Sequence, residues 1–300
     1  MIKDLRFYIL LHLIIFMWGF TGILGKLILL DPVYIVFFRV VIAFVSLLFG
    51  LRLLRMPRKV AGKRQTWKVI GVGCIVAIHW LTFYTAIDLS TASLGILCLS
   101  TTTLHVTWLE PLVFRKRFSP VEFLFGLMVV FGIYFVSENF TPDQYLALGI
   151  GLISALCAAL FAVFNAKLSE DTPTSAITLY EMGTGVVILG IMMLCTGKIN
   201  SAMFSMRWED LGWLLFLGIA CTSFAFLATL EVVKKLGAFT VSLSINLEPV
   251  YTILLAIPIL HEDKMLSGNF YIGAVLIIAI VVLNAVYKSY ISRRKKAETT

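Results

Sequence analysis

Residues 7–29 read FYILLHLIIFMWGFTGILGKLIL and carry a single formal charge, that of Lys26. A helix crosses the roughly 30 Å hydrocarbon core of a bilayer with about 20 predominantly apolar residues. The stretch therefore predicts a membrane-spanning helix. Lys3 and Arg6 precede it, as in a signal peptide, but the run continues to residue 29 without a small-x-small cleavage pattern. We expect a retained first helix.

The rest of the 300-residue chain extends this pattern. Its composition is 60% hydrophobic and 14% charged, and its mean hydropathy is +0.95, whereas soluble domains are about 25% charged. So little charge excludes a soluble enzyme, a secreted disulfide domain and a disordered regulator. The runs are continuous instead of alternating, which disfavours a β-barrel. We predict an all-α integral membrane protein with ten transmembrane helices, near residues 7–29, 33–53, 67–87, 91–114, 120–137, 146–166, 175–196, 209–230, 238–260 and 268–288.

The distribution of lysine and arginine predicts the orientation. If the N-terminus is cytoplasmic, most of the 25 basic residues fall in cytoplasmic segments, notably 52–68, 115–117 and 288–296, as the positive-inside rule requires. An even number of crossings then places both termini in the cytoplasm, and we expect location in the inner (plasma) membrane. The net charge of +8 is a topology signal, because no soluble domain carries a basic patch that would bind nucleic acid.

The chain also matches itself. Identical residues pair at an offset of 141 as Lys26–Lys167, Pro32–Pro173, Trp67–Trp208 and Gly71–Gly212, and at an offset of 147 as Pro111–Pro258, Phe123–Phe270 and Gly126–Gly273, where Ser93 also meets Thr240. We predict a first repeat over 1–140, a second over 141–290 and a basic cytoplasmic tail over 291–300. Because each repeat has an odd number of crossings, five, the second repeat enters the membrane from the opposite side and has inverted topology. Inverted repeats are typical of secondary transporters, with a substrate site near the midplane, although a duplicated protein that carries nothing is the alternative.

These features resemble the drug/metabolite transporter superfamily, and specifically its EamA type with two five-helix repeats. The resemblance covers essentially the whole chain. It is carried by Trp18-Gly19-Phe20 through Lys26, by Trp80 with Phe83-Tyr84-Thr85-Ala86, by Thr91-Ala92-Ser93, by Gly237 to Ser242 leading into Glu248-Pro249, and by Glu262. The first repeat departs from the family pattern in two places. Thr101 and Thr102 lie near the position of the family's proline in the fourth helix, and Arg115-Lys116-Arg117 replace the acidic residue that follows that helix. The resemblance implies export of small metabolites, such as amino acids, related compounds or toxic amphipathic molecules.

Glu248 is the first candidate for a functional site. It lies ten residues into the predicted helix 238–260, which is about 15 Å deep at 1.5 Å per residue and near the midplane. An ionisable side chain there is expensive and is a functional candidate by default. Pro249 follows it and can kink or gate the helix by removing a backbone hydrogen bond. We expect Glu248 to bind a substrate ammonium group or exchange a proton. The alternative is a carboxyl group that only holds the kink.

Further candidates are polar or aromatic groups inside apolar runs, where they either line a substrate path or bind neighbouring helices. For substrate binding or coupling these are His79, Trp80, Tyr84, Trp18, Thr102, His105, Tyr251 and Asn246, and for gating Gly22, which lies in a stripe of small residues. Arg39 requires a partner that the sequence does not identify, and Glu181 is expected in a cytoplasmic vestibule. The five cysteines stand singly in apolar runs, so we expect no disulfide, metal or cofactor.

We therefore predict a secondary active or facilitative transporter that exports small metabolites by alternating access around a midplane site, and no enzyme. The expected partners are a small-molecule substrate, the lipid bilayer and, if transport is coupled, protons; the protein is a monomer or a homodimer. The chain lacks GxxxxGK[ST], which argues against ATP-driven transport. The alternatives are an intramembrane enzyme acting on a lipid or isoprenoid, and a scaffold or receptor. The loops of this chain contain no cluster of aspartate, histidine or arginine, which argues against the enzyme. The chain has no extramembrane domain, which argues against the scaffold or receptor.

Overall fold

A computed structural model describes residues 2–137, 140–236, 241 and 244–298, and these residues form helices and connecting turns. The helices are α1 (Ile2–Leu27), α2 (Pro32–Leu53), α3 (Lys63–Leu89), α4 (Ala92–Ser100), α5 (Thr102–Phe114), α6 (Pro120–Val136), α7 (Pro142–Leu168), α8 (Thr174–Cys195), α9 (Trp208–Leu215), the π-helix η2 (Phe216–Phe224), α10 (Ala225–Leu236), α12 (Glu248–Leu260) and α13 (Gly268–Glu298), with 3-10 turns η1 (Ser201–Phe204) and η3 (Glu262–Lys264).

Within the described residues, eight helical segments are long and apolar enough to cross a membrane, and α6 and α12 are shorter apolar helices. These helices coincide with the predicted apolar runs. The run 91–114 is divided at Thr101 into α4 and α5. The start of the run 238–260, with most of the Gly237–Ser242 motif and the Ser93–Thr240 pair, lies outside the described residues. The count of ten spans therefore stays a prediction.

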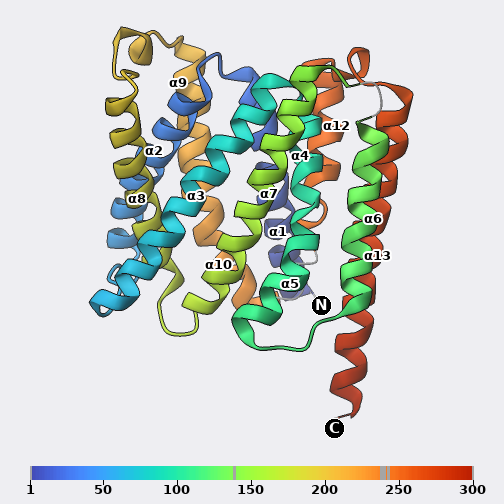
Figure 1. The fold of residues 1–300 in the computed structure, drawn as a ribbon. Helices are drawn as coiled ribbons and strands as arrows, with labels where there is room; N and C mark the ends of the chain where they lie inside the picture. The colour runs from blue at the N-terminus through green and yellow to red at the C-terminus, as the bar shows by residue number, and fades with distance from the viewer. Residues whose placement is uncertain (1, 138–139, 237–240, 242–243, 299–300) are drawn as a thin grey trace.

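Helices from the two halves of the chain pack against each other. Helix α3 packs along α7 and α8, and α1 packs along α10 and α12. Helices in equivalent places of the two halves also pair, α2 with α8 and α6 with α13. The first helices of the halves, α1 and α7, run in opposite directions, and the two chain ends lie at the same end of the bundle (Figure 1). Opposite directions of these two helices are what an inverted repeat requires, and the inverted repeat stays a prediction.

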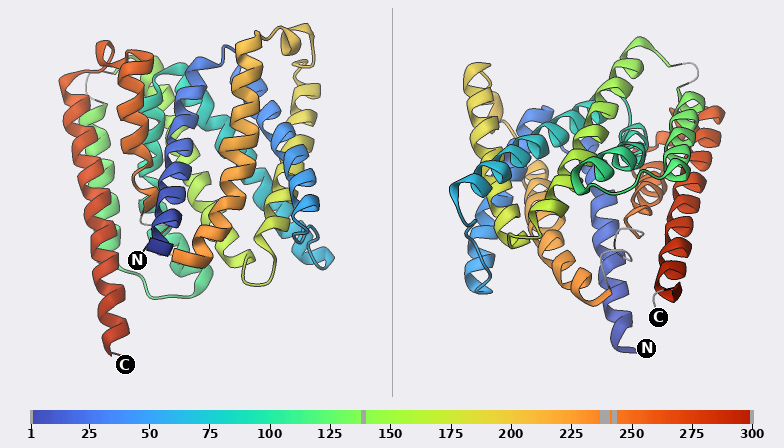
Figure 2. Two further views of the ribbon diagram at one scale, coloured as in Figure 1. Left: turned by 180° about the vertical axis from the view of Figure 1, so that it is seen from behind. Right: turned by 60° about the horizontal axis from the view of Figure 1, so that its bottom comes forward.

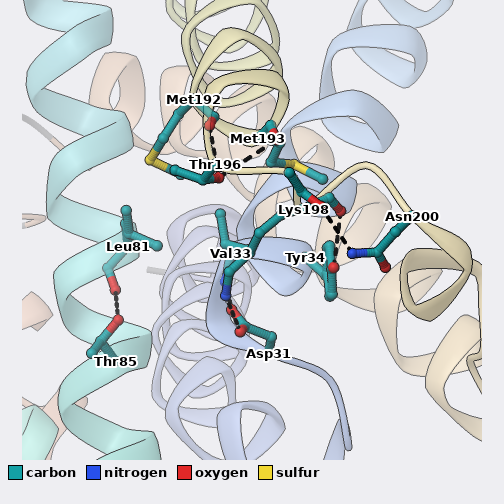
Figure 3. Close-up of polar contacts among 11 residues, drawn as sticks. Asp31, Val33, Tyr34, Leu81, Thr85, Met192, Met193, Thr196, Lys198 and Asn200 are labelled. Carbon is teal, nitrogen blue, oxygen red and sulfur yellow. Dashed lines mark hydrogen bonds and ion pairs between the residues drawn. The ribbon is translucent and has the colours of Figure 1, made fainter.

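At the end of the bundle opposite the chain termini, polar contacts join the start of α2 to the loop after α8. Asp31 accepts a hydrogen bond from the Val33 amide at 3.0 Å and so begins α2. The same carboxylate forms an ion pair with Lys198, whose carbonyl accepts from the Tyr34 hydroxyl at 2.9 Å. Figure 3 shows these groups around the end of α8. At the other end, Ser175 on α8 donates to the Pro57 carbonyl at 2.7 Å.

Glu262 ties the second half of the chain to the first. Its side chain is 2% exposed, and its two oxygens accept from the backbone amides of Ala92 at 2.7 Å and Ser93 at 3.1 Å. These amides begin α4 and have no partner within that helix. A carboxylate there satisfies them and interacts favourably with the helix dipole. Glu262 therefore fixes the start of a helix that belongs to the other repeat.

The pair formed by α6 and α13 stands at one edge of the bundle (Figure 2). The two helices approach closely where glycine replaces a side chain. A Cβ atom on Gly273 would lie 2.6 Å from Val136 Cγ2, 2.8 Å from the Gly132 carbonyl oxygen and 2.9 Å from the Val136 amide nitrogen. Two of these atoms belong to the backbone, so α6 would have to move as a unit to admit a methyl group.

We predict that Gly273→Ala separates α6 from α13 and lowers the free energy of unfolding by about 1–3 kcal/mol, the usual cost of overpacking a close contact. The matched control is Gly149→Ala on α7, where an added Cβ meets no atom within 4 Å. That change should be neutral or stabilising, because alanine is the better helix former. Thermal unfolding in one detergent measures both, and equal effects would contradict the close approach.

Candidate functional site

A cavity of about 520 Å³ lies between the two halves of the bundle. Its walls combine apolar and aromatic side chains with a set of polar ones, as expected of a small-molecule site. Its residues on α7 and α8 (158–165 and 181–182) come from the halves of those helices nearer the chain termini, and its residues on α1 and α2 (18–21 and 39) come from the opposite halves. The cavity is therefore central along the bundle (Figure 1). The polar lining residues are Thr21, Arg39, His79, Ser100, Thr102, Thr103, Asn165, Glu181, Asn246, Glu248 and Asn284.

Two helix starts meet this cavity. Helix α5 begins at Thr102 after the single residue Thr101, whose backbone keeps right-handed helical angles (φ −70°, ψ −12°), so α4 and α5 form one apolar span with a local break. Helix α12 begins at Glu248 after a turn over 246–247. The offset of 147 places Thr101 on Glu248 and Thr102 on Pro249, so the break and the helix start occupy equivalent places.

The interpretation of Pro249 as a kink inside a continuous helix is corrected by this geometry. The residue lies in the first turn of α12. A proline there removes no intrahelical hydrogen bond, because the first amides of a helix have no partner within it. Glu248 is accordingly the first residue of α12 and not one in the middle of a long helix. Its backbone carbonyl accepts from the Thr252 hydroxyl at 3.1 Å, and that hydroxyl also donates to the Gly19 carbonyl at 2.9 Å.

Arg39 is the charged group for which the sequence identified no partner, and the structure supplies neutral ones. The side chain is 4% exposed. Its Nε donates to Thr222 Oγ1 at 3.1 Å and its Nη1 donates to the Tyr84 hydroxyl at 3.4 Å. The guanidinium carbon lies 3.9 Å from the centre of the Trp80 ring, a cation–π contact. Arg39 forms no ion pair with any residue that the structure describes.

Two carboxyl groups share the cavity with Arg39. Glu248 is close enough to interact electrostatically with the guanidinium. Glu181 on α8 is 2% exposed and interacts with the side chain of Asn165 on α7. Glu181 was expected in a vestibule at the cytoplasmic end, and it lines the central cavity instead. The difference arises because α3 and α7 cover this part of α8, which the position of Glu181 in its own run does not reveal.

Several polar oxygens around the cavity have no hydrogen-bond partner among the residues that the structure describes. They are Glu181 Oε1, Asn165 Oδ1, Asn284 Oδ1 and Ser100 Oγ, from four different helices. Buried acceptors are ordinarily paired, and leaving one unpaired costs about 1–3 kcal/mol. A molecule with N–H donors, such as an amine, would satisfy these acceptors. The cavity is therefore suited chemically to a ligand that carries an amino group.

The residues predicted for the site divide into two sets. Lining the cavity are Glu248, His79, Trp80, Trp18, Thr102, Asn246 and Pro249. Among these, His79 is also held by its neighbour helix, with Nδ1 2.8 Å from Ser154 Oγ, and Thr102 donates to the Ala155 carbonyl at 3.2 Å. The residues outside the lining are Tyr84, His105, Tyr251 and Gly22.

Each residue of the second set has a packing role. Tyr84 lies behind the lining, beside Arg39. His105 packs against Trp108, and the Tyr251 hydroxyl is 3.0 Å from His12 Nδ1. A Cβ atom on Gly22 would lie 3.1 Å from Thr252 Cγ2, so this glycine lets α1 approach α12. Sequence reasoning gave no role to Thr222 or Asn284. Their only signal was a polar side chain inside an apolar run, which many structural residues share.

Metal binding has no support in the described part of the chain, since no group of three or more histidine, cysteine, aspartate or glutamate side chains is arranged to hold an ion. The available chemistry is hydrogen bonding, charge pairing and proton exchange.

The fold and the cavity between two interlocked halves define a multi-pass membrane protein of the transporter class. The sequence model of the EamA-like transporter family matches residues 5–138 and 145–286, one match in each half. The chain belongs to this family, and the predicted resemblance to the drug/metabolite transporter superfamily is confirmed.

Two further comparisons bear on the chain, one in sequence and one in fold alone. An "Uncharacterized transporter" of Clostridium kluyveri is 27% identical over 164 residues, which is 54% of this chain and 51% of that protein. The match thus spans about half the length of that relative. A solved crystal structure with 16% sequence identity superposes with a TM-score of 0.63 over 93% of this chain and 97% of that one, so the fold is shared.

We predict that Thr222→Val destabilises the protein by about 1–3 kcal/mol, because it removes the acceptor for Arg39 Nε at a position that is 0% exposed. Thr229→Val is the matched control on the same span. Its hydroxyl donates only to the Ala225 carbonyl, at 2.7 Å, so its loss should change stability by less than about 0.5 kcal/mol. Thermal unfolding in detergent compares the two. Equal small effects would mean that Thr222 does not hold Arg39.

Proposed function

We propose that this protein is a secondary transporter that moves a small amine-bearing metabolite, such as an amino acid or a related compound, by alternating access around the central cavity. The observation that carries the proposal is the group formed by Arg39, Glu181 and Glu248 within one cavity between the halves. Ionisable groups in a membrane interior mark substrate and ion pathways. The family assignment supports transport as the general activity.

Charge balance supports a coupling mechanism. A buried site holding one guanidinium group is electrically neutral when one of the two carboxyl groups is ionised and the other keeps its proton. An entering ammonium group supplies a second positive charge, and neutrality is restored when the remaining proton leaves. Substrate and proton then compete for the same carboxyl groups, which is the requirement for exchange of one against the other. A zwitterionic amino acid adds no net charge, so it can bind with its carboxylate at Arg39 and its ammonium group at the ionised carboxyl group; this charge balance couples only a substrate with a net positive charge to proton release.

The predicted orientation supports a direction for this proposal. With both termini in the cytoplasm of the cell, as the basic segments predict, the central cavity lies between the two repeats. Movement of one repeat against the other would open it to the inside, where substrate enters, and then to the outside, where substrate is released. We propose the plasma membrane as the location and export as the direction.

The proposal is tested by measuring uptake into proteoliposomes that contain the purified protein. The labelled compounds are amino acids, amines, and carboxylic acids that lack an amino group, and each is measured with and without a pH gradient. We expect saturable flux of amine-bearing compounds that responds to the gradient. Flux only of compounds without an amino group, or flux of none in vesicles with inserted, folded protein, would contradict it.

Glu→Gln variants refine the test, because they remove charge and proton exchange while keeping shape. We predict that Glu248→Gln and Glu181→Gln each lower transport at least tenfold and abolish its response to the pH gradient. Glu110→Gln is the matched control. Glu110 lies outside the cavity lining and pairs with Lys116 at 2.6 Å, so its variant should transport within twofold of the wild type. A pH response that survives in both cavity variants would remove the carboxyl groups from the coupling.

A further inference from the structure

A second hollow, of about 970 Å³, lies on the side of the bundle between α2, α3 and α8. Its trough is formed by Phe44, Leu48, Ile70, Leu179, Val187 and Ile188. One end is bounded by Arg58 and Lys59, in the segment that joins α2 to α3. The central cavity and this groove share no lining residue.

The trough faces the hydrocarbon of the bilayer. Leu48 is 39% exposed and Val187 is 59% exposed, and both belong to helices that are long and apolar enough to span a membrane. A hollow in such a surface is not stably filled by water, because its walls offer few hydrogen-bonding partners. Hydrocarbon chains are the material that fits and surrounds it.

The polar end of the groove is positively charged. Arg58 and Lys59 follow the end of α2 by a few residues, which puts them at the level of lipid headgroups. Neither forms an ion pair with any described residue. The nearby turn between α7 and α8 contains Glu170 and Asp171, and Glu170 already pairs with Lys167 at 2.6 Å. Basic residues next to a membrane attract anionic headgroups.

The loop that carries the charges is held in place. The Ser175 hydroxyl donates to the Pro57 carbonyl at 2.7 Å, which fixes the residue before Arg58 against the start of α8. On the trough itself, Gly183 allows α8 to approach α2, since an added Cβ would lie 3.1 Å from Phe44 Cε2. These contacts hold the basic loop in a fixed position relative to the apolar trough.

We propose that this groove binds one anionic glycerophospholipid, with an acyl chain in the trough and the phosphate group at Arg58 and Lys59. An apolar trough next to two basic groups that form no ion pair with any described residue favours such a lipid over a zwitterionic one, whose own cationic group offsets the attraction of its phosphate. Helix α8 links the groove to the central cavity, since Tyr180 and Gly183 face the lipid while Glu181 and Met182 line the cavity. The bound lipid thus contacts the helix that carries a site carboxyl group.

Native mass spectrometry of the full chain in detergent tests the proposal, with phosphatidylglycerol and phosphatidylcholine of identical acyl chains as probes. We expect the wild type to bind phosphatidylglycerol about tenfold or more tightly than phosphatidylcholine, because two basic groups contribute at the headgroup. Arg58→Gln with Lys59→Gln should reduce this preference to within twofold. Arg115→Gln with Arg117→Gln removes the same charge from exposed positions of another loop and should keep the preference.

The trough is tested separately. Val187→Trp fills it and should weaken both lipids at least fivefold, whereas Ile191→Trp, one turn along α8 at a position 55% exposed and outside the groove, should not. All these changes are on the surface, so monodisperse elution verifies folding. Glycerophosphoglycerol, which has no acyl chains, must bind more weakly than phosphatidylglycerol, and equal binding overturns the proposal. It is also overturned if the Arg58/Lys59 and Arg115/Arg117 double variants lose the preference for phosphatidylglycerol to the same extent, or if Val187→Trp binds both lipids as tightly as the wild type.

Discussion

The guanidinium group of Arg39 has to be solvated by protein, because it lies inside a helix that spans the membrane and is almost fully buried. A charge at the bilayer centre costs at least about 2.5–3.5 kcal/mol when protein or water does not compensate it. The ring face of Trp80 and the hydroxyl of Tyr84 come from α3, and the hydroxyl of Thr222 comes from η2. Solvating one side chain therefore requires α2 to pack against both of these elements, one from each half of the chain.

The π-helix η2 is what brings the hydroxyl groups to α2. Its wider turns let Thr222 donate to the Leu217 carbonyl at 2.8 Å and Ser223 to the Gly218 carbonyl at 3.1 Å, each five residues back. Ser223 also lies 2.6 Å from Ser46 Oγ on α2. π-Helical turns are uncommon and are frequent at functional sites. Here the turn leaves Thr222 Oγ1 free to accept from Arg39.

The sequence predicts the helices well, because long apolar runs and Asp-Pro or Ser-Pro boundaries carry that information locally. It also identifies the repeat, and it points to Glu248 as a polar group inside an apolar run. Whether such a group lines a cavity depends on the rotation and tilt of its helix, which apolar periodicity does not determine. For this reason the sequence does not distinguish Tyr84 and Tyr251 from the lining residues, and it predicts a vestibule position for Glu181.

The sequence also does not predict the local break at Thr101 or the start of α12 at Glu248. Threonine is compatible with a continuous helix, and a proline after Glu248 suits either a kink or a helix start. Tertiary contacts decide between these outcomes, such as the hydrogen bond from Thr102 to the Ala155 carbonyl on α7. The chemistry of the site thus depends on contacts between residues far apart in the chain.

The central claim is that Arg39 and Glu248 balance each other's charge within one cavity. A double-mutant cycle in unfolding free energy, with Arg39→Gln, Glu248→Gln and the combined variant in the same detergent, tests it most directly. We predict that the combined variant loses less stability than the two single variants together, by about 1 kcal/mol or more, because removing both charges restores neutrality. Effects that add to within about 0.5 kcal/mol would contradict the claim.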